Sequence, residues 1–268
     1  MGLYQFWKTI YKLTIQKMTN PWEIKQTDER TADSLTTFII FCEDEVSEPI
    51  YFKFFETSKI KVNPIKRQKS MIDNVINAIC HCKENNLFEE VDGKECACKP
   101  GNQVWCVFDR DLEETEEKQK KGNVTFDESI KTALSHGIKL AWSNDSFELW
   151  VLLHFENVDA ENAKNKNRQT YYDRLTEIFK NIKNPNEDLL KVLNYKGYSY
   201  KESLKRENNF RNIVRPEIVK NTKKAIERAK ELETKFSSPN LAEHEKSPYT
   251  LVHHLVEELI KYGGKEID

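Results

Sequence analysis

Two short apolar segments each run directly into a group of acidic residues, and this pattern limits the fold more than any other feature of the chain. Residues 35–42 (LTTFIIFC) and 104–108 (VWCVF) are rich in β-branched and aromatic side chains and are too short for buried helices. Continuous apolar runs of this length are typical of strands buried on both faces, as in parallel sheets. The acids that follow are Glu43, Asp44, Glu45 and Glu48 after the first run, and Asp109 and Asp111 after the second. We therefore predict two central parallel strands that end in acidic turns.

Segments with helical periodicity separate these strands. Pro49, a residue favoured in a first helical turn, indicates a helix over residues 48–58. Further helices are expected over residues 70–84, 126–136 and 146–155, and further strands over residues 59–65 and 138–142. This alternation predicts an α/β fold, an open and mainly parallel sheet with helices on its faces.

The chain after residue 156 differs from this core because its strand signals stop. Helical patterns occur over residues 170–182, 216–235 and 250–262. Two polar segments are expected to be loops, residues 112–123, a solvated loop or frayed helix, and residues 237–247. We predict a core over residues 35–156 and a basic helical C-terminal region over residues 157–268 that packs on it.

Residues 1–34 are predicted to form an amphipathic N-terminal extension. The opening MGLYQFWKTIYKLTIQKM interrupts its apolar residues with Lys8, Lys12 and Lys17, which is not the pattern of a secretory signal. Such a helix is expected to pack on the body of the protein or on a second copy in a homo-oligomer. Attachment to a membrane surface is the alternative, although it would need a second anchoring signal. Six cysteines are too few for a disulfide scaffold, so we expect a reducing, cytoplasmic location and no membrane span.

The formal net charge of −2 over 268 residues hides an asymmetry. Residues 160–235 contain 19 Lys and Arg against 11 Asp and Glu, which leaves the rest of the chain at about −10. Five tyrosines among these cations are expected to stack on unpaired bases: Tyr171, Tyr172, Tyr195, Tyr198 and Tyr200. The alternative is an ordinary solvated surface, because lysine-rich helices are common.

Three acidic loops are expected to meet at one edge of the sheet. Ligands of open α/β sheets gather beyond the carboxyl ends of the strands. Since side chains at i and i+2 of an extended segment point the same way, Asp109 and Asp111 can face one point while Arg110 faces elsewhere. A third loop carries Asn144, Asp145 and Glu148. Such oxygen ligands suit Mg²⁺ or Mn²⁺, whereas each acid taken alone is equally typical of a helix cap or a solvated side chain.

The segments that carry these acids resemble a known family. IIFCEDEVSEPIYFKFF, VWCVFDRD and WSNDSFELWVLLHF are similar to the RloB-like family, whose core resembles the Toprim fold of topoisomerases, primases and the nucleases of the overcoming-lysogenization-defect type. The resemblance spans residues 37–156 and continues more weakly through Tyr195 and Lys196 to SPYTLVHHLVEEL. It implies a Toprim/Rossmann-like core and an endonuclease that uses Mg²⁺ or Mn²⁺ to hydrolyse RNA, including tRNA, or DNA.

The resemblance also implies roles for particular residues. A catalytic, metal-binding Glu43 and an Asp-x-Asp pair, Asp109 and Asp111, match the family pattern, and Glu48 matches a further metal-binding acid. A further acid and a phosphate-contacting base would be Glu148 and Lys196. The nucleic-acid contacts expected in the basic region are Lys164, Lys166, Arg168, Lys201, Lys205 and Arg206.

One position departs from the family, which commonly has glycine after the first glutamate where this chain has Asp44. Glycine allows backbone conformations that are costly to other residues, so the shape or charge of this turn is expected to differ. The family association implies a role in bacterial defence against phage, of the abortive-infection type, beside an ABC-type ATPase partner. The competing hypothesis is a non-catalytic regulatory or binding module of such a defence complex, with Asp44 as a sign of lost activity.

Two cysteine pairs form a second candidate site. Cys80 and Cys82 are separated by 13 residues from Cys96 and Cys98, and four thiols in this arrangement could hold one structural Zn²⁺. Cys80 and Cys82 would face apart if the helix over residues 70–84 continued through them, and free thiols are the alternative.

The histidines add less. His154 lies in an apolar helix and is expected to be a packing residue, and the adjacent His253 and His254 are expected not to share one helix face.

Overall fold

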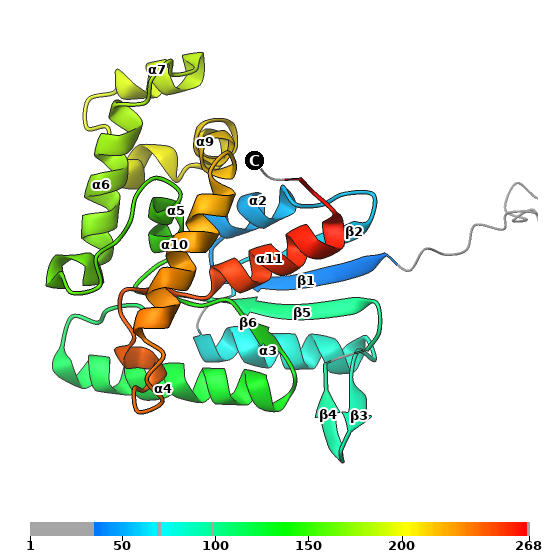
Figure 1. The fold of residues 1–268 in the computed structure, drawn as a ribbon. Helices are drawn as coiled ribbons and strands as arrows, with labels where there is room; N and C mark the ends of the chain where they lie inside the picture. Colours follow the sequence, from blue (N-terminus) through cyan, green and yellow to red (C-terminus); the bar gives the residue numbers. More distant parts are fainter. Residues whose placement is uncertain (1–34, 69–70, 98, 267–268) are drawn as a thin grey trace, which may run out of the picture. The chain divides into compact units, whose positions relative to one another are not determined.

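A four-stranded parallel sheet in the order β2-β1-β5-β6 forms the centre of the protein (Figure 1). The computed structural model describes residues 35–68, 71–97 and 99–266, so the extension predicted over residues 1–34 lies outside the described residues. The strands are β1 (Thr36–Cys42), β2 (Ile60–Ile65), β5 (Asn102–Val107) and β6 (Lys139–Leu140). Both predicted central strands and the α/β class are confirmed.

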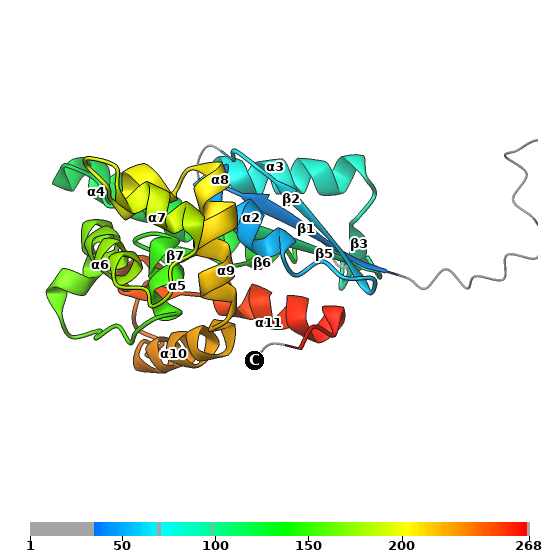
Figure 2. The same cartoon turned by 90° about the horizontal axis from the view of Figure 1, so that it is seen from above.

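Helices cover both faces of the sheet (Figure 2). Phe38 and Ile40 of β1 belong to the core shared with α2 (Ser47–Lys53) and α11 (Val252–Gly263), whereas Ile39 and Phe41 pack with α3 (Met71–Glu84) and α4 (Glu116–Ser135). Alternate residues of a strand point to opposite faces, which is why one apolar run supplies two cores.

Helix α4 is longer than predicted. It begins at Glu116, with Thr115 as its N-cap, inside the segment expected to be a loop. Its buried residues, Phe126, Ser129, Ile130 and Ala133, all lie in its second half. The first half faces solvent and therefore has no apolar periodicity, although it stays helical.

Most of the C-terminal region lies beyond the carboxyl ends of β1 and β5, whereas α11 runs along one face of the sheet (Figure 1). Its principal helices are α6 (Arg168–Lys180), α7 (Glu187–Leu193), α9 (Arg215–Val219) and α10 (Thr222–Lys235), with α5 (Glu148–Leu153) beneath them. Shorter turns are the 3₁₀ segments η1 (Ala163–Lys166) and η4 (Glu243–Glu245), the helix α8 (Glu207–Asn209), and two π-helical turns, η2 (Tyr200–Leu204) and η3 (Phe210–Val214). The helix predicted over residues 216–235 is thus two helices.

Two short pairings were not expected from the sequence. Strand β8 (Tyr249–Thr250) pairs antiparallel with β7 (Ser143–Asn144), so the predicted absence of strands after residue 156 is wrong. A hairpin of β3 (Glu89–Val91) and β4 (Lys94–Cys96) follows α3. Two- and three-residue strands are too short to show a periodicity. Within the described part of the chain, no helix has the length and apolar character needed to cross a membrane.

Candidate active site

The acidic loops after β1 and β5 lie side by side at the point where the chain changes direction across the sheet. From β1 the chain moves to β2 on one side and reaches β5 on the other, and ligands of open α/β sheets bind at such switch points. The backbone N–H of Glu43 donates to the carbonyl of Val107 (3.1 Å). In return, Glu43 Oε2 accepts from the backbone N–H of Asp109 (2.9 Å). The first predicted acids of the two loops are therefore in direct contact.

The third acidic loop adjoins the second. Asp109 pairs with Ser143 in an isolated parallel bridge, and Arg110 N–H donates to the Ser143 carbonyl (2.8 Å). The side chain of Arg110 donates to Asn123 and Asn144, away from the two aspartates that flank it. The expectation that Arg110 faces elsewhere is confirmed, and all three acidic loops meet at one edge.

Asp44 caps helix α2. Its carboxylate accepts from three successive backbone N–H groups, those of Glu45 (2.6 Å), Val46 (3.1 Å) and Ser47 (2.8 Å). Its own N–H donates to Glu48 Oε2 (3.2 Å), and its φ is not positive. The aspartate therefore satisfies backbone N–H groups at a helix N-terminus, at a position that needs no glycine conformation.

The acids at this edge destabilise one another's charged forms. Burial, followed by the charge of Asp111, raises the pKa of Glu43 to about 7 despite the hydrogen bond from Asp109. Burial and the neighbouring Asp109, Asp44 and Glu43 raise the pKa of Glu48, which is 1% exposed. Burial and the charges of Glu43, Glu148 and Asp111 likewise raise the pKa of Asp109. The positive charge of Arg168 lowers the pKa of Glu43 and of Asp109, but burial and the neighbouring acids outweigh it.

Asp111 lies at the exposed rim of the site and is held by Arg168, the first residue of α6. Arg168 also forms an ion pair with Asp145 (Nη2 to Oδ1, 2.7 Å), whose side chain is 1% exposed. Burial lowers the pKa of Arg168, but Asp145 and Asp111 more than offset this and raise it. Asp145 therefore anchors the start of α6 over the acidic edge, a role that the sequence analysis did not assign to it.

Glu148 is paired with Lys205, at the end of η2, and not with Lys196. The Lys205 Nζ lies 2.7 Å from Glu148 Oε1 and 5.7 Å from the ring centroid of Tyr172. Lys196 is exposed in the turn after α7. The lysine that contacts Glu148 is thus Lys205, and the phosphate-contacting role implied for Lys196 stays a prediction.

The acidic edge fits a hard divalent cation by the chemistry of its donors. Glu43, Glu48 and Asp109 supply oxygens alone, and Asp109 Oδ1 is buried without a hydrogen-bond partner among the described residues. These carboxylates do not converge on one point. In the described part of the chain, no three of them have oxygens that all lie within 4.8 Å of one another. Asp111, the remaining acid of this edge, is hydrogen-bonded to Arg168.

A profile of the RloB-like protein family matches residues 38–259, which contain every residue of this site. The chain belongs to the RloB-like protein family. No curated protein and no solved structure gives a significant match to it. The matched region contains β1, β5 and the acidic loops that follow them, and it also contains Arg168 and Lys205. The contacts described above therefore lie in the part of this RloB-like protein that the family model covers.

The predicted nucleic-acid contacts divide into two groups. Arg168 and Lys205 contact site acids, whereas four exposed cations belong to the segments that carry them: Lys164, Lys166, Lys201 and Arg206. The prediction of stacking tyrosines is wrong for Tyr171, Tyr172 and Tyr200, which are 0%, 7% and 0% exposed. Their rings fill the core of the helical region, and only Tyr195 is largely exposed.

The cysteine pairs are spread over two elements. In α3, Cys80 is exposed and Cys82 is buried, so the two face apart as a continuous helix requires. Cys96 is half-buried in β4, and Cys98 lies outside the described residues, so the four-cysteine zinc site stays a prediction. Burial raises the pKa of Cys82 to about 11, which disfavours the thiolate that zinc binds.

His154 behaves as predicted, while His253 and His254 do not. His154 is buried and its ring contacts the Trp150 carbonyl (2.8 Å) and the Tyr51 hydroxyl (3.2 Å). His253 and His254 both contact the carboxylate of Glu233, although they are adjacent in sequence. In the first turn of α11 the two side chains can turn toward one partner on a neighbouring helix.

Proposed function

We propose that this RloB-like protein is a Toprim-like, metal-dependent nuclease that hydrolyses phosphodiester bonds of RNA, including tRNA, or of DNA. The observation that carries the proposal is the gathering of Glu43, Glu48 and Asp109 at the switch point between β1 and β5, with the pKa of each raised. Perturbed acids at a ligand-binding edge are typical of functional sites. A divalent cation is the partner that would relieve their repulsion.

The residues of the site would divide the work of hydrolysis. Glu43, Glu48 and Asp109 would hold Mg²⁺ or Mn²⁺, with Asp111 at the rim, and the ion would polarise the phosphate and activate water. Glu43, with a pKa of about 7, can accept or donate a proton near neutral pH. Lys205 and Arg168 lie beside the acids and can bind phosphate oxygens when a substrate is present.

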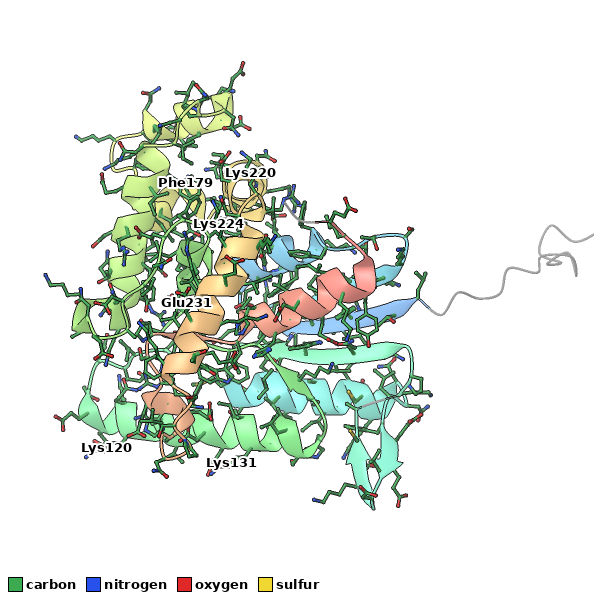
Figure 3. The ribbon with its side chains drawn as sticks, viewed as in Figure 1. Lys120, Lys131, Phe179, Lys220, Lys224 and Glu231 are labelled. Carbon is green, nitrogen blue, oxygen red and sulfur yellow. The ribbon has the colours of Figure 1, made fainter. Side chains whose placement is uncertain are left out.

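The cations nearest the site favour a polyanionic substrate. Lys164 and Lys166 precede Arg168, and Lys201 and Arg206 flank Lys205, all of them exposed. Other exposed lysines lie on different helices, Lys120 and Lys131 on α4 and Lys220 and Lys224 at α9 and α10 (Figure 3). The four lysines Lys120, Lys131, Lys220 and Lys224 therefore do not form one continuous path for a nucleic acid. A role in anti-phage defence beside an ABC-type ATPase, in the cytoplasm, is part of the proposal and comes from the family association.

The proposal is tested by cleavage of tRNA, single-stranded DNA and duplex DNA with Mn²⁺, using the purified full chain. We expect the Asp109→Asn protein to lose cleavage and the Asp92→Asn protein to keep it. Asp92 is exposed in the β3–β4 turn at φ +51°, a conformation that asparagine tolerates well, so this control changes the same charge away from the site. Undiminished cutting by the Asp109→Asn protein would overturn the assignment.

A non-catalytic regulatory module is the second candidate, and one observation favours it. Arg168 and Lys205 already neutralise Asp111, Asp145 and Glu148 through ion pairs within the chain. A docking surface built this way has no need of a cation. Titration with Mn²⁺ separates the two functions, because the nuclease binds the ion and loses it in the Asp109→Asn protein, whereas the module does neither.

A further inference from the structure

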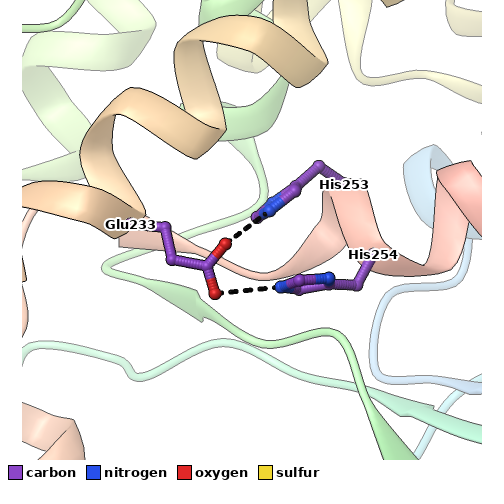
Figure 4. Close-up of side chains that lie close together, drawn as sticks. All are labelled: Glu233, His253 and His254. Carbon is purple, nitrogen blue, oxygen red and sulfur yellow. Dashed lines mark hydrogen bonds and ion pairs between the residues drawn. The ribbon is translucent and has the colours of Figure 1, made fainter. Parts of the chain in front are cut away.

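A second cluster of metal-binding side chains lies between α10 and α11 (Figure 4). Glu233, in the last turn of α10, faces the two adjacent histidines in the first turn of α11. His253 Nε2 lies 2.9 Å from Glu233 Oε2, and His254 Nε2 lies 3.0 Å from Glu233 Oε1. The three ligand atoms lie within 4.8 Å of one another, and no other group of three His, Cys, Asp or Glu residues in the described chain meets that limit.

One side of the cluster is closed and the other is open. The side chain of His253 is fully buried, while those of Glu233 and His254 are 34% and 44% exposed. Glu233 and His254 also line a groove of about 600 Å³ together with Tyr249 and Glu257. An ion held here would have protein ligands on one side and free coordination positions toward the groove.

The donor set selects a class of ion. Two imidazole nitrogens and one carboxylate suit Zn²⁺ and its neighbours Co²⁺, Ni²⁺ and Cu²⁺, whereas Mg²⁺ prefers oxygen alone. Bonds of about 2.0–2.1 Å in a tetrahedral site place ligand atoms roughly 3.3 Å apart. The two histidines contact different oxygens of Glu233, at 2.9 and 3.0 Å, and the three ligand atoms lie within 4.8 Å of one another, so the side chains must shift to close on one ion.

Binding requires that each Nε2 present its lone pair to the ion. The ring proton then moves to Nδ1, and in His253 this atom is buried without a hydrogen-bond partner among the described residues. The hydrogen bonds from Nε2 to Glu233 are then exchanged for bonds to the ion, no hydrogen bond is lost at Nδ1 of His253, and the new N–H stays unpaired. We therefore expect weaker affinity than in sites whose second nitrogen is hydrogen-bonded.

We propose that Glu233, His253 and His254 bind one transition-metal ion of the Zn²⁺ class and thereby clasp the end of α10 to the start of α11. The segment between them contains β8, which pairs with β7 directly before Asp145. The ion would close this segment into a loop held at both ends. This proposal does not depend on the nuclease activity.

The test uses the untagged, chelator-treated full chain, titrated with Zn²⁺ and with Co²⁺. We expect binding of one Zn²⁺ with a rise in the melting temperature, and Co²⁺ absorption in the visible without the near-ultraviolet bands of thiolate ligation. The Glu233→Gln and His254→Ala proteins should each lose this binding by at least about tenfold. Glu233→Gln keeps the shape and polarity of the side chain, so it remains informative if His254→Ala unfolds.

The matched control is His244→Gln. His244 contacts the carboxylate of Asp127 (Nδ1 to Oδ2, 2.7 Å) and, within the described part of the chain, belongs to no group of three metal-binding side chains. The control protein and an Asp109→Asn protein should both bind Zn²⁺ as the unmodified chain does. Unchanged affinity in the Glu233→Gln protein would overturn the proposal, and thiolate bands with Co²⁺ would overturn it and assign the ion to the cysteines.

Discussion

Asp109-x-Asp111 and Cys80-x-Cys82 have the same spacing but opposite geometry. The aspartates follow a strand, and the charge of Asp111 raises the pKa of both Glu43 and Asp109 while Arg110 points away. The cysteines lie in α3, where positions two apart differ by about 200° around the axis, and one is exposed while the other is buried. The comparison teaches that spacing predicts a shared site only after the element that carries it is known.

The two pairs also differ in energy. The aspartates belong to a set of charges that burial and repulsion destabilise, so a bound cation would stabilise the protein. Cys82 lies in an apolar core, where a neutral thiol packs as a small hydrophobic group. Replacing Asp109 should therefore raise the stability of the metal-free protein, whereas replacing Cys82 should lower it.

The largest effect is expected from Asp109→Asn. Removing a proposed ligand should weaken Mn²⁺ binding by more than about 100-fold, the upper end of losses caused by outer-shell changes. The metal-free variant should at the same time unfold at a higher temperature, because one of the repelling charges is gone. Calorimetric titration and thermal melting measure both quantities. The contrast between the two pairs would be contradicted if Cys82→Ser weakened Mn²⁺ binding as much as Asp109→Asn does. It would also be contradicted if the metal-free Asp109→Asn protein were less stable than the metal-free unmodified chain.

Lys205→Met should give the next largest effect. Without Lys205 the buried Glu148 has no ion-pair partner, and breaking such a pair costs about 3–5 kcal/mol of unfolding free energy. Chemical denaturation measures this loss. The Lys201→Met protein is the control, since Lys201 also lies over the Tyr172 ring (5.9 Å) but has no acid partner among the described residues. Adding Glu148→Gln to Lys205→Met should restore most of the stability, and a failure to do so would show that packing on Tyr172 is what matters.

The pH dependence of the acidic site has a definite sign. The folded pKa of Glu43 is about 7, above its ordinary value of 4.5, so between these values the folded state holds a proton that the unfolded state has lost. The contribution of Glu43 to the stability of the metal-free protein should therefore be greatest below pH 4.5 and should fall as the pH rises to about 7. Mn²⁺ affinity should rise over the upper part of the same range, because the ion needs the carboxylate.

Denaturation and Mn²⁺ titration at several pH values between 5 and 8 check both trends. In the Glu43→Gln protein, stability should depend less on pH. The remaining dependence should come from Glu48 and Asp109, whose pKa values are also raised. A metal-free stability that rises with pH across this range in the unmodified chain would contradict the electrostatic account of the site.

The sequence predicted the sheet and the acids that border it, because apolar runs and the residues after them are local features. Residues 35–42 and 104–108 became the central strands, and Glu43 and Asp109 met at their ends. The partners of these acids were harder to predict. Arg168 and Lys205 reach the site only through the packing of α6 and η2, which no local pattern encodes.

Two errors show where burial overrode a sequence pattern. Tyrosines among lysines indicated a base-stacking surface, but Tyr171 and Tyr200 face the core while the lysines beside them face solvent. Adjacent histidines indicated divergent directions, but at the start of α11 both reach Glu233 of α10. In each case a contact between distant segments decided the outcome.

The smallest effects are expected at the cysteines. Cys82→Ser places a hydroxyl in the apolar core beside α3 and should cost about 1–3 kcal/mol of unfolding free energy, whereas Cys80→Ser should change it by less than about 0.5 kcal/mol. In the native protein, a thiol reagent should label Cys80 rapidly and leave Cys82, Cys42 and Cys106 unlabelled, because the last three are buried. If Cys80 were protected from the reagent as well as the three buried cysteines are, a bound ion would be the explanation. That result would favour the four-cysteine zinc site over free thiols.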